Sequence, residues 1–483
     1  MERLTKIGQV IPKKSCDIKH SRIGLGFEKL DRNVFDPRKA YPFVAQSGAK
    51  WARLQSGWQR TERVKGVYDF QWLDEIVDNM IAVGVEPWLC LCYGNELYTD
   101  YAARYFGAVG CPPVRTPQER EGWRSYVMAT VEHFKGRIHY YEIWNEPDGE
   151  WCWKTGINAK ELGEFTIATA KACKQADPTC EVIGFVLCKF KGFTAEDGTS
   201  DEKGEFIEAL AQTGCCEYLD GISYHAYMPG EEGFLHAFEK MDDIRRRYNP
   251  RLKIFQGESG TQSRSDGMGA LRGGAWTELK QAKYLLRHLL VDLGLGVEFT
   301  SYFSCMDMIE ALNGLNGQVN TYLDYGYFGV IGADFDENGV SSGEYSPKPS
   351  FRALQNLCSI FCNDYTHAKL PVEAVVEYSP RVLADDFDFA KARSYGFTKP
   401  NGSSAICYWK PTDILTETYE GTISIRVPEY RFASEIALVD LLDGSIYRIP
   451  DEMKSHEPNV TLKLSHLPIF DHPMLLTFGD FCQ

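Results

Sequence analysis

The chain has no apolar run of membrane-spanning length and no recognisable leader. No stretch of ~18 uninterrupted apolar residues occurs among its 483 residues. The opening residues, MERLTKIGQVIPKKSC, contain neither an apolar segment of signal-peptide length nor a small-residue cleavage site. We therefore expect a cytoplasmic protein that has no membrane partner.

The chain also has no excess of basic residues. It carries 52 lysines and arginines against 67 aspartates and glutamates, which gives a formal net charge of −15. This balance disfavours nucleic acid and anionic membranes as partners and suits a neutral substrate better. Aromatic residues make up 13% of the chain, and aromatic rings can stack on the apolar faces of sugars as well as fill a core.

The sequence contains no complete zinc motif: Cys358 and Cys362 stand four apart and Cys215 is next to Cys216, but no companion cysteine or histidine pair at zinc spacing accompanies either. The 15 cysteines are an odd number, and several, including Cys90 and Cys92, lie where a strand would bury them, so free thiols are expected. The segment DFDENG at 334–339 begins like a calcium loop, but Tyr345 occupies the place of the bidentate glutamate. We expect no metal and no cofactor.

Short apolar runs alternate with amphipathic segments from about residue 23 to residue 361. The segments between the runs have helical spacing, and strands that alternate with helices pair in parallel. Eight such units predict an α/β fold, a closed (β/α)8 barrel. The predicted strands are IGLGF, AKWARLQ, EPWLCLCY, IHYYEIW, CEVIGFVL, LDGISYHAY, LKIFQGE and VEFTSYFS.

The helical period ends near residue 362, and short runs of alternating residues follow, separated by turn signals such as KPNG and LDG. This pattern predicts an antiparallel β-sandwich. The first twenty residues are too polar for a barrel strand and are candidates for an edge strand of that sandwich. The predicted units are therefore 1–20, the barrel at 21–362, and the sandwich at 363–483.

Two glutamates stand at the carboxyl ends of predicted strands. Glu146 follows the fourth strand in YYEIWNEPDGEWCW, and Glu258 ends the seventh in LKIFQGESG. The carboxyl ends of barrel strands share one face, so these side chains should meet. A lone glutamate at a strand end is usually solvated or half of an ion pair. A close pair with one ionised member is what retaining hydrolysis of a glycosidic bond needs.

Other strand ends supply partners for this pair. Arg53, on the second strand, is expected to donate to Glu258, or to serve in a structural ion pair. His225 and Tyr227 stand two apart on the sixth strand and so share a face. Tyr227 is expected to donate to Glu258, whereas a buried histidine is often only a core residue. Asn145 is a candidate for binding the sugar 2-hydroxyl.

Two further residues are predicted at the substrate. Trp151 and Trp153 lie on the loop after the fourth strand, where packing explains a tryptophan less easily. We expect one of them, Trp153, to form a wall of the site. Glu28, at the end of the first strand, is predicted to bind sugar hydroxyls or to cap a loop.

These motifs carry a family resemblance. WNEP, the glutamate in QGESG, the His-x-Tyr pair and the arginine on the second strand resemble clan A of the glycoside hydrolases, which are retaining enzymes. GFEKLDR, GVYDFQWLDEIVD and WNEPDGEWCW resemble family 39 of that clan, the β-xylosidase and α-L-iduronidase family, which joins its barrel to a β-sandwich. The resemblance implies that Glu146 is the acid/base and Glu258 the nucleophile.

The eighth strand departs from the clan. Its members usually carry a tryptophan beneath the sugar there, whereas TSYFSCMD offers Tyr302 or Phe303. We take Tyr302 as the substrate-binding residue, and we expect a sugar other than the usual xylose or glucose.

The sequence therefore predicts an exo-acting retaining glycosidase that cleaves the β-glycosidic bonds of a neutral oligosaccharide or glycoside by double displacement. An endo-glycanase or α-L-glycosidase of the same clan is the alternative among enzymes, and loop lengths would discriminate between a pocket and a groove. A catalytically silent carbohydrate-binding protein, with the sandwich as binding module, is the alternative from another class. The oligomeric state is left open.

Overall fold

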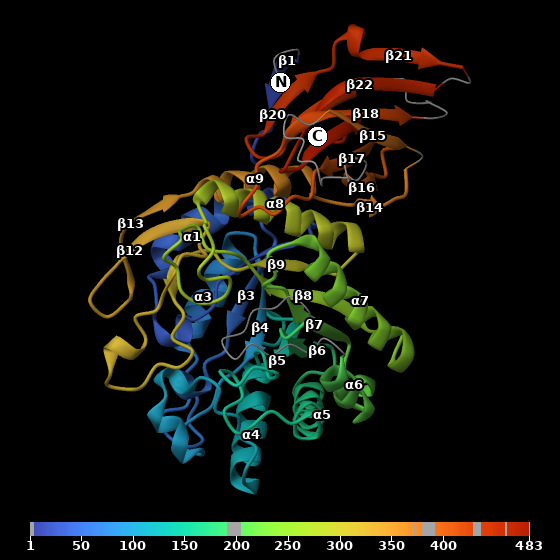
Figure 1. Cartoon of the computed structure of the whole chain (residues 1–483). Helices are drawn as coiled ribbons and strands as arrows, with labels where there is room; N and C mark the ends of the chain where they lie inside the picture. The colour runs from blue at the N-terminus through green and yellow to red at the C-terminus, as the bar shows by residue number, and fades with distance from the viewer. Residues whose placement is uncertain are drawn as a thin grey trace.

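The computed structural model describes residues 4–190, 204–370, 372–378, 392–427, 436–458 and 461–482. A closed barrel with surrounding helices forms the larger part, and antiparallel sheets lie along one side of it (Figure 1). In the described part of the chain, no helix combines the length and the apolar composition that crossing a membrane requires.

Eight parallel strands close the barrel within the described residues; seven lie inside their predicted runs, and β8 extends one residue beyond its run, to Ser259. The predicted (β/α)8 barrel is thereby confirmed. The strands are β2 (Ile23–Gly26), β3 (Trp51–Gln55), β4 (Glu86–Leu91), β5 (Tyr140–Ile143), β6 (Glu181–Leu187), β7 (Gly221–His225), β8 (Lys253–Ser259) and β9 (Thr300–Tyr302).

Amphipathic helices surround the strands, and local signals set their ends. Thr116 and Glu119 form a capping box at the start of α4, and Gly296, at φ 76°, ends α8 in the left-handed conformation. The helices are α1 (Pro37–Ser47), α2 (Trp58–Thr61), α3 (Gln71–Ala82), α4 (Pro117–His133), α5 (Ala159–Ala176), α6 (Glu205–Gln212), α7 (Glu231–Tyr248), α8 (Glu278–Leu295) and α9 (Pro349–Ile360).

The two ends of the barrel interior are filled by different kinds of side chain. Near the amino ends of the strands, Trp88, Phe255 and Phe299 are fully buried and pack against Trp51 and Tyr140. The Trp88 and Phe299 ring centroids are 4.4 Å apart, and those of Phe255 and Phe299 are 4.5 Å apart. This aromatic layer fills one end of the barrel, so the polar side chains gather at the other, where barrel enzymes place their sites.

Two hairpins lie between β9 and α9. They consist of β10 (Met308–Ile309) with β11 (Tyr325–Gly326), and β12 (Ile331–Phe335) with β13 (Ser341–Pro347). The segment 334–339, which begins like a calcium loop, makes the turn of the second hairpin, where Asp336 accepts hydrogen bonds from the backbone of Asn338 and Val340.

The C-terminal region is antiparallel, as expected. One sheet has the order β1-β20-β19-β23-β17-β16-β14 and the other β15-β18-β22-β21, and buried side chains such as Ile423, Leu438 and Leu476 form a common core. The strands are β14 (Thr366–His367), β15 (Glu373–Tyr378), β16 (Arg393–Thr398), β17 (Ser404–Trp409), β18 (Glu420–Val427), β19 (Ile436–Asp440), β20 (Ser445–Arg448), β21 (Lys454–Glu457), β22 (Thr461–Phe470) and β23 (Met474–Phe478).

The N-terminal strand β1 (Thr5–Gln9) pairs antiparallel with β20, so the beginning of the chain lies at the edge of a C-terminal sheet (Figure 1). The division of the chain at residues 20 and 362 stays a prediction.

A buried ion pair and a hydrogen-bonded network link helices α7 and α8 to the C-terminal region. Lys283 contacts both carboxylate oxygens of Asp471 at 2.7 and 2.8 Å, and Arg287 binds Glu231, which also accepts a 2.7 Å hydrogen bond from Trp409. Both side chains of the Lys283–Asp471 pair are at most 10% exposed.

Replacing Lys283 by alanine should destabilise the protein by about 3–5 kcal/mol, because the substitution leaves the Asp471 carboxylate buried without its cation. Thermal or denaturant unfolding measures the effect. Arg38→Ala is the matched control: its partner is Glu75, and this pair is exposed to solvent, so its loss should shift the midpoint far less. Equal shifts for the two variants would contradict a role for Lys283 in holding the two parts together.

Candidate active site

A pocket of about 1000 Å³, including its open mouth, lies at the carboxyl ends of the barrel strands. Four of the predicted site residues line it: Asn145, Glu146, Tyr227 and Glu258. They come from the ends of β5, β7 and β8, so residues more than a hundred positions apart in the sequence share one cavity.

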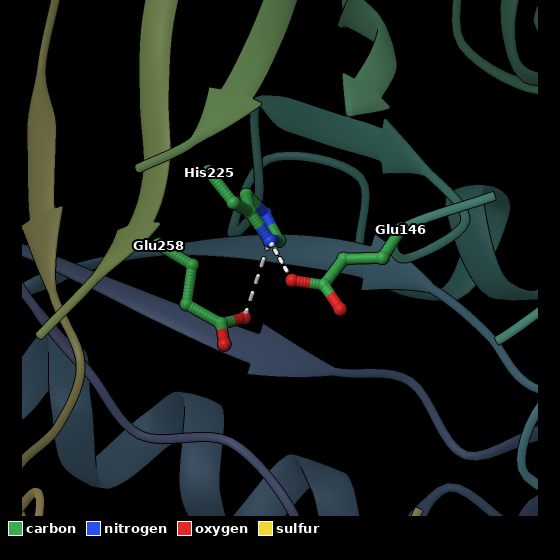
Figure 2. A group of neighbouring side chains, drawn as sticks. All are labelled: Glu146, His225 and Glu258. Atoms are coloured by element: carbon green, nitrogen blue, oxygen red, sulfur yellow. Dashed lines mark hydrogen bonds and ion pairs between the residues drawn. The ribbon is translucent and has the colours of Figure 1, made fainter. Parts of the chain in front are cut away.

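Glu146 and Glu258 face each other across His225 (Figure 2). One carboxylate oxygen of each glutamate and one ring nitrogen of His225 lie within 4.8 Å of one another. The backbone turns sharply where β5 ends, since Trp144 and Glu146 both have positive φ, 65° and 46°. Non-glycine residues adopt this conformation rarely, and they do so mainly where the surrounding structure holds a functional group in place.

Both oxygens of the Glu258 carboxylate accept hydrogen bonds. Arg53 donates from Nη1 to Oε2 at 2.8 Å, and the Tyr227 hydroxyl donates to Oε1 at 2.5 Å. An ionised carboxylate is an acceptor only, so two donors suit that form. They also fix the direction in which the carboxylate points, which is toward the cavity that it lines.

Glu146 has a different environment. Trp151 donates from Nε1 to Oε2 at 2.7 Å, and His225 Nδ1 lies 2.9 Å from Oε1. Burial raises the pKa of Glu146 above its ordinary value, and the Trp151 hydrogen bond opposes this shift. Burial lowers the pKa of His225 to about 4, so the imidazole is neutral at neutral pH. Glu146 is thus the member of the pair that is suited to hold a proton.

Arg53 fills both of the roles considered for it. Its guanidinium is fully buried, with Nε 2.7 Å and Nη2 2.6 Å from Glu142 Oε2, and Nη2 also donates to Asn145 Oδ1 at 2.8 Å. It is therefore an ion-pair partner of Glu142 and a donor to Glu258. Glu142 was not singled out from the sequence, although a charged residue inside the apolar strand YYEIW is a signal that could have identified it.

Glu28 does not reach the pocket. It is fully buried beneath it, with Oε1 3.5 Å from Arg53 Nη1. Burial, together with the negative charge of Glu258, raises the pKa of Glu28 to about 8. The hypothesis that Glu28 binds sugar hydroxyls is therefore corrected: its carboxyl belongs to the charged layer that supports Arg53.

The prediction that Trp153 forms a wall of the site is wrong, and its neighbour Trp151 takes that position. The backbone N–H groups of Cys152 and Trp153 both bond to the Gly149 carbonyl, and this tight turn sends Trp153 into the core. Trp153 is 1% exposed and packs on Trp144 and Phe165 with centroid distances of 5.6 and 5.5 Å. Trp151 lines the pocket instead.

A similar correction applies to Tyr302. It is the last residue of β9, fully buried, and does not line the pocket, whereas Phe303 does. Successive side chains along a strand point to opposite faces, so a shift of one residue exchanges the inward and outward positions. Phe303 lies at the position expected to meet the sugar, with the Phe328 ring 5.3 Å away.

Several pocket residues were missed in the sequence because they lie on irregular segments. Lys29 Nζ is 3.2 Å from Glu310 Oε2 and lies 4.9 Å from the centroid of the Phe303 ring. Burial raises the pKa of Glu310 to about 7, and Lys29 opposes the shift. Tyr93 adds another aromatic wall. The hairpin insertion after β9 brings Glu310 to the pocket. No periodic pattern in the sequence predicts this hairpin.

Glu146, His225 and Glu258 also have the spacing of a metal-binding group. Their ligand atoms, however, already take part in hydrogen bonds with one another, with Arg53 and with Tyr227. A metal cation would have to approach the Arg53 guanidinium as well. These hydrogen bonds therefore suit an ionised carboxylate beside a protonated carboxyl better than metal coordination.

The chain is similar in sequence to known glycoside hydrolases. The model of glycosyl hydrolases family 39 matches residues 52–247. A β-xylosidase of Geobacillus stearothermophilus is 27% identical over 190 residues, 37% of this chain, and the match spans about a third of the relative's length, 35%.

Solved structures share the fold over nearly the whole chain. A family 39 glycoside hydrolase from the gut symbiont Bacteroides cellulosilyticus WH2 superimposes with a TM-score of 0.64 at 16% identity, covering 95% of this chain and 81% of that one. A monomeric β-xylosidase from Caulobacter crescentus CB15 gives 0.57 at 16% identity, covering 99% and 98%. The chain is thus similar to family 39 glycoside hydrolases in part of its sequence and in its fold.

Proposed function

We propose that this chain, whose barrel resembles that of family 39 glycoside hydrolases, is a retaining glycosidase that acts on a neutral glycoside. The observation that carries the proposal is the spacing of the pair: oxygens of Glu146 and Glu258 lie within 4.8 Å of each other. Retaining enzymes hold their carboxyl groups about 5–5.5 Å apart, whereas inverting enzymes leave about 6.5–9.5 Å for a water molecule.

The reaction proceeds in two steps. Glu258 attacks the anomeric carbon and forms a glycosyl ester, while Glu146 gives its proton to the departing glycosidic oxygen. Water then enters, Glu146 removes its proton, and the resulting hydroxide oxygen attacks the anomeric carbon and displaces Glu258. Arg53 and Tyr227 hold the nucleophile in the attacking orientation through hydrogen bonds of 2.8 and 2.5 Å.

The pocket walls support recognition of a sugar. Phe303, Phe328 and Trp151 offer aromatic surface, and Asn145 stands beside the acid, where it would bind the 2-hydroxyl. Glu310 brings a carboxyl to the same cavity for other hydroxyls. A cavity lined from many sides favours exo action. An endo-acting enzyme or an α-L-glycosidase remains the alternative among enzymes.

A silent carbohydrate-binding protein is less well supported. Binding alone would not require a carboxylate held by two donors next to a second carboxyl whose pKa is raised by burial. The curated relative is named a β-xylosidase. Aryl β-D-xylosides are therefore the first substrates to test, although Phe303, where the clan usually has tryptophan, argues for testing other pentosides and hexosides too.

The first sugar released should keep the anomeric configuration of the substrate, because two displacements at one carbon restore it. A panel of aryl glycosides identifies a substrate, and proton NMR within the first minutes of turnover records the anomer before mutarotation. Mixing authentic α and β sugars under the same conditions provides the control. An inverted first product would exclude the double displacement.

A further inference from the structure

Three buried polar atoms lie together behind His225, on the side away from the pocket. They are Glu142 Oε1, Ser223 Oγ and His225 Nε2, all in side chains with 0% exposure. None of them has a hydrogen-bond partner among the described residues. Unpaired buried polar atoms are uncommon, because leaving one unsatisfied costs about 1–3 kcal/mol.

The three atoms converge on one point beside Gly257. A methyl group added there would lie 2.6 Å from Ser223 Oγ, 2.9 Å from Glu142 Oε1 and 3.0 Å from His225 Nε2. Only glycine leaves this space open. The three groups are therefore near enough to be joined directly or through a single water molecule.

The chemistry of the three groups decides which of them donates. Glu142 Oε2 is held by Arg53 at 2.6–2.7 Å, and a carboxylate paired with a guanidinium can only accept. The Ser223 hydroxyl can rotate to either role. His225 Nε2 thus shares this space with a fixed acceptor, and the ring can supply a proton to that acceptor only when Nε2 carries it.

We propose that Glu142 holds His225 in the Nε2–H tautomer, and that the bare Nδ1 accepts the acid proton of Glu146 in the resting enzyme. The catalytic meaning of this tautomer rests on the proposed function. Glu142 is then a positioning residue, since it acts on the acid through the imidazole and does not line the pocket.

The tautomer with the proton on Nδ1 would create a repulsion between His225 and Glu142. A proton on Nδ1 would donate to Glu146 at 2.9 Å, but the Nε2 lone pair would then face the Glu142 carboxylate. In the proposed tautomer, Oε1–H of Glu146 donates to Nδ1 while Trp151 donates to Oε2, so every polar atom of the acid is satisfied. Burial lowers the pKa of His225, which keeps the imidazole neutral, and raises the pKa of Glu146, so both shifts favour a proton on Glu146.

This arrangement serves both steps of the reaction. Before cleavage, Glu146 holds the proton, and its hydroxyl needs only to redirect its hydrogen bond from His225 Nδ1 to the glycosidic oxygen. After cleavage, the Glu146 carboxylate faces a ring nitrogen that cannot donate to it, and this lack of a donor makes it a stronger base toward the incoming water. A histidine that donated from Nδ1 would lower the pKa of Glu146, so that less of it would hold the proton before cleavage and its carboxylate would be a weaker base afterwards.

The tautomer is measured directly on the resting wild-type enzyme. With histidine labelled by nitrogen-15, the two ring nitrogens give separate signals, and His225→Asn identifies the pair that belongs to residue 225. We expect a protonated Nε2 and a bare Nδ1 at neutral pH. A protonated Nδ1 would overturn the proposal, whatever the enzyme does to glycosides.

Glu142→Gln should reverse the tautomer. Arg53 requires an acceptor, so the amide oxygen should face Arg53 and the amide nitrogen should face His225 Nε2 as a donor. The proton would then move to Nδ1. Cleavage of substrates with poor leaving groups should fall about 10²-fold, the low end of a general-acid contribution, and cleavage of activated aryl glycosides should fall much less.

Ser223→Ala is the matched control, because it removes a neighbouring polar group and leaves the Glu142 acceptor. It should retain the Nε2–H signal. A retained Nε2–H signal in Glu142→Gln would count against the proposal. If that variant does not fold, the wild-type spectrum still shows which nitrogen of His225 carries the proton. If the wild type shows Nε2–H but hydrolyses no glycoside, the proposed function fails and the tautomer assignment stands.

Discussion

Glu258→Ala should reduce hydrolysis by at least about 10⁴-fold, because alanine cannot form the covalent intermediate on which both steps depend. The protein should still fold. Arg53 keeps its ion pair with Glu142 at 2.6 Å when Glu258 is removed, so no buried cation is left without a partner. Initial rates on an activated aryl glycoside measure the loss, and thermal unfolding verifies the fold.

The loss should be specific to this carboxylate. Glu75→Ala removes an exposed carboxylate of the same barrel and should leave the rate unchanged. A Glu258→Ala variant that keeps a substantial rate would remove this residue from the mechanism.

External azide should partly restore activity to Glu258→Ala. The small anion can enter the space left by the carboxylate and attack the anomeric carbon from the same side as Glu258 would. Only one displacement then occurs, so the product is a glycosyl azide of inverted configuration. The same experiment on the wild type should give the retained sugar, and the contrast between the two products assigns the face of attack to residue 258.

The barrel could be predicted because its signal is periodic. Eight apolar runs separated by helical segments leave little choice of topology, and parallel strands bring their carboxyl ends to one face. Glu146 and Glu258 followed from this, since each ends a strand within a distinctive motif. Arg53 and Tyr227 followed by the same logic, and each is found hydrogen-bonded to Glu258.

The loops could not be predicted in the same way, because a single turn decides which of two neighbours faces the substrate. Trp151 and Trp153 are the same residue type on the same loop, so the sequence does not distinguish them. The backbone hydrogen bonds to the Gly149 carbonyl direct Trp153 into the core. Tyr302 and Phe303 differ by one position at the end of a strand. Once the regular strand has ended, the local sequence does not determine which of two neighbouring side chains points toward the pocket.

Buried charges were the other difficulty. Glu142 stands on a barrel strand and Glu28 just after one, yet neither lines the pocket, and the network around Arg53 assigns them supporting positions. Which carboxyl meets the arginine depends on how β2, β3, β5 and β8 are placed around the barrel axis. That information is long-range, and it becomes visible only when the strands are closed into a barrel.

Glu146→Ala should separate substrates by their leaving groups. Glycosides whose aglycone must be protonated to depart should lose activity by about 10²–10⁴-fold, the usual contribution of a general acid. Activated aryl glycosides release a stable phenolate without help, so their first step should be little affected. Rates on a series of aryl glycosides of graded leaving-group pKa measure this difference. Glu150→Ala, an exposed carboxylate on the same loop, is the control.

The second step provides an independent test of the same residue. Glu146→Ala also lacks the base that activates water, so with activated substrates the glycosyl ester on Glu258 should accumulate. Mass spectrometry of the quenched variant should find one added glycosyl unit on the peptide that contains QGESG. An equal loss on good and poor leaving groups, with no trapped ester, would mean that Glu146 only binds or supports, and that the acid is another residue. In that case the raised pKa and the contacts with Trp151 and His225 would have to serve substrate binding instead of proton transfer.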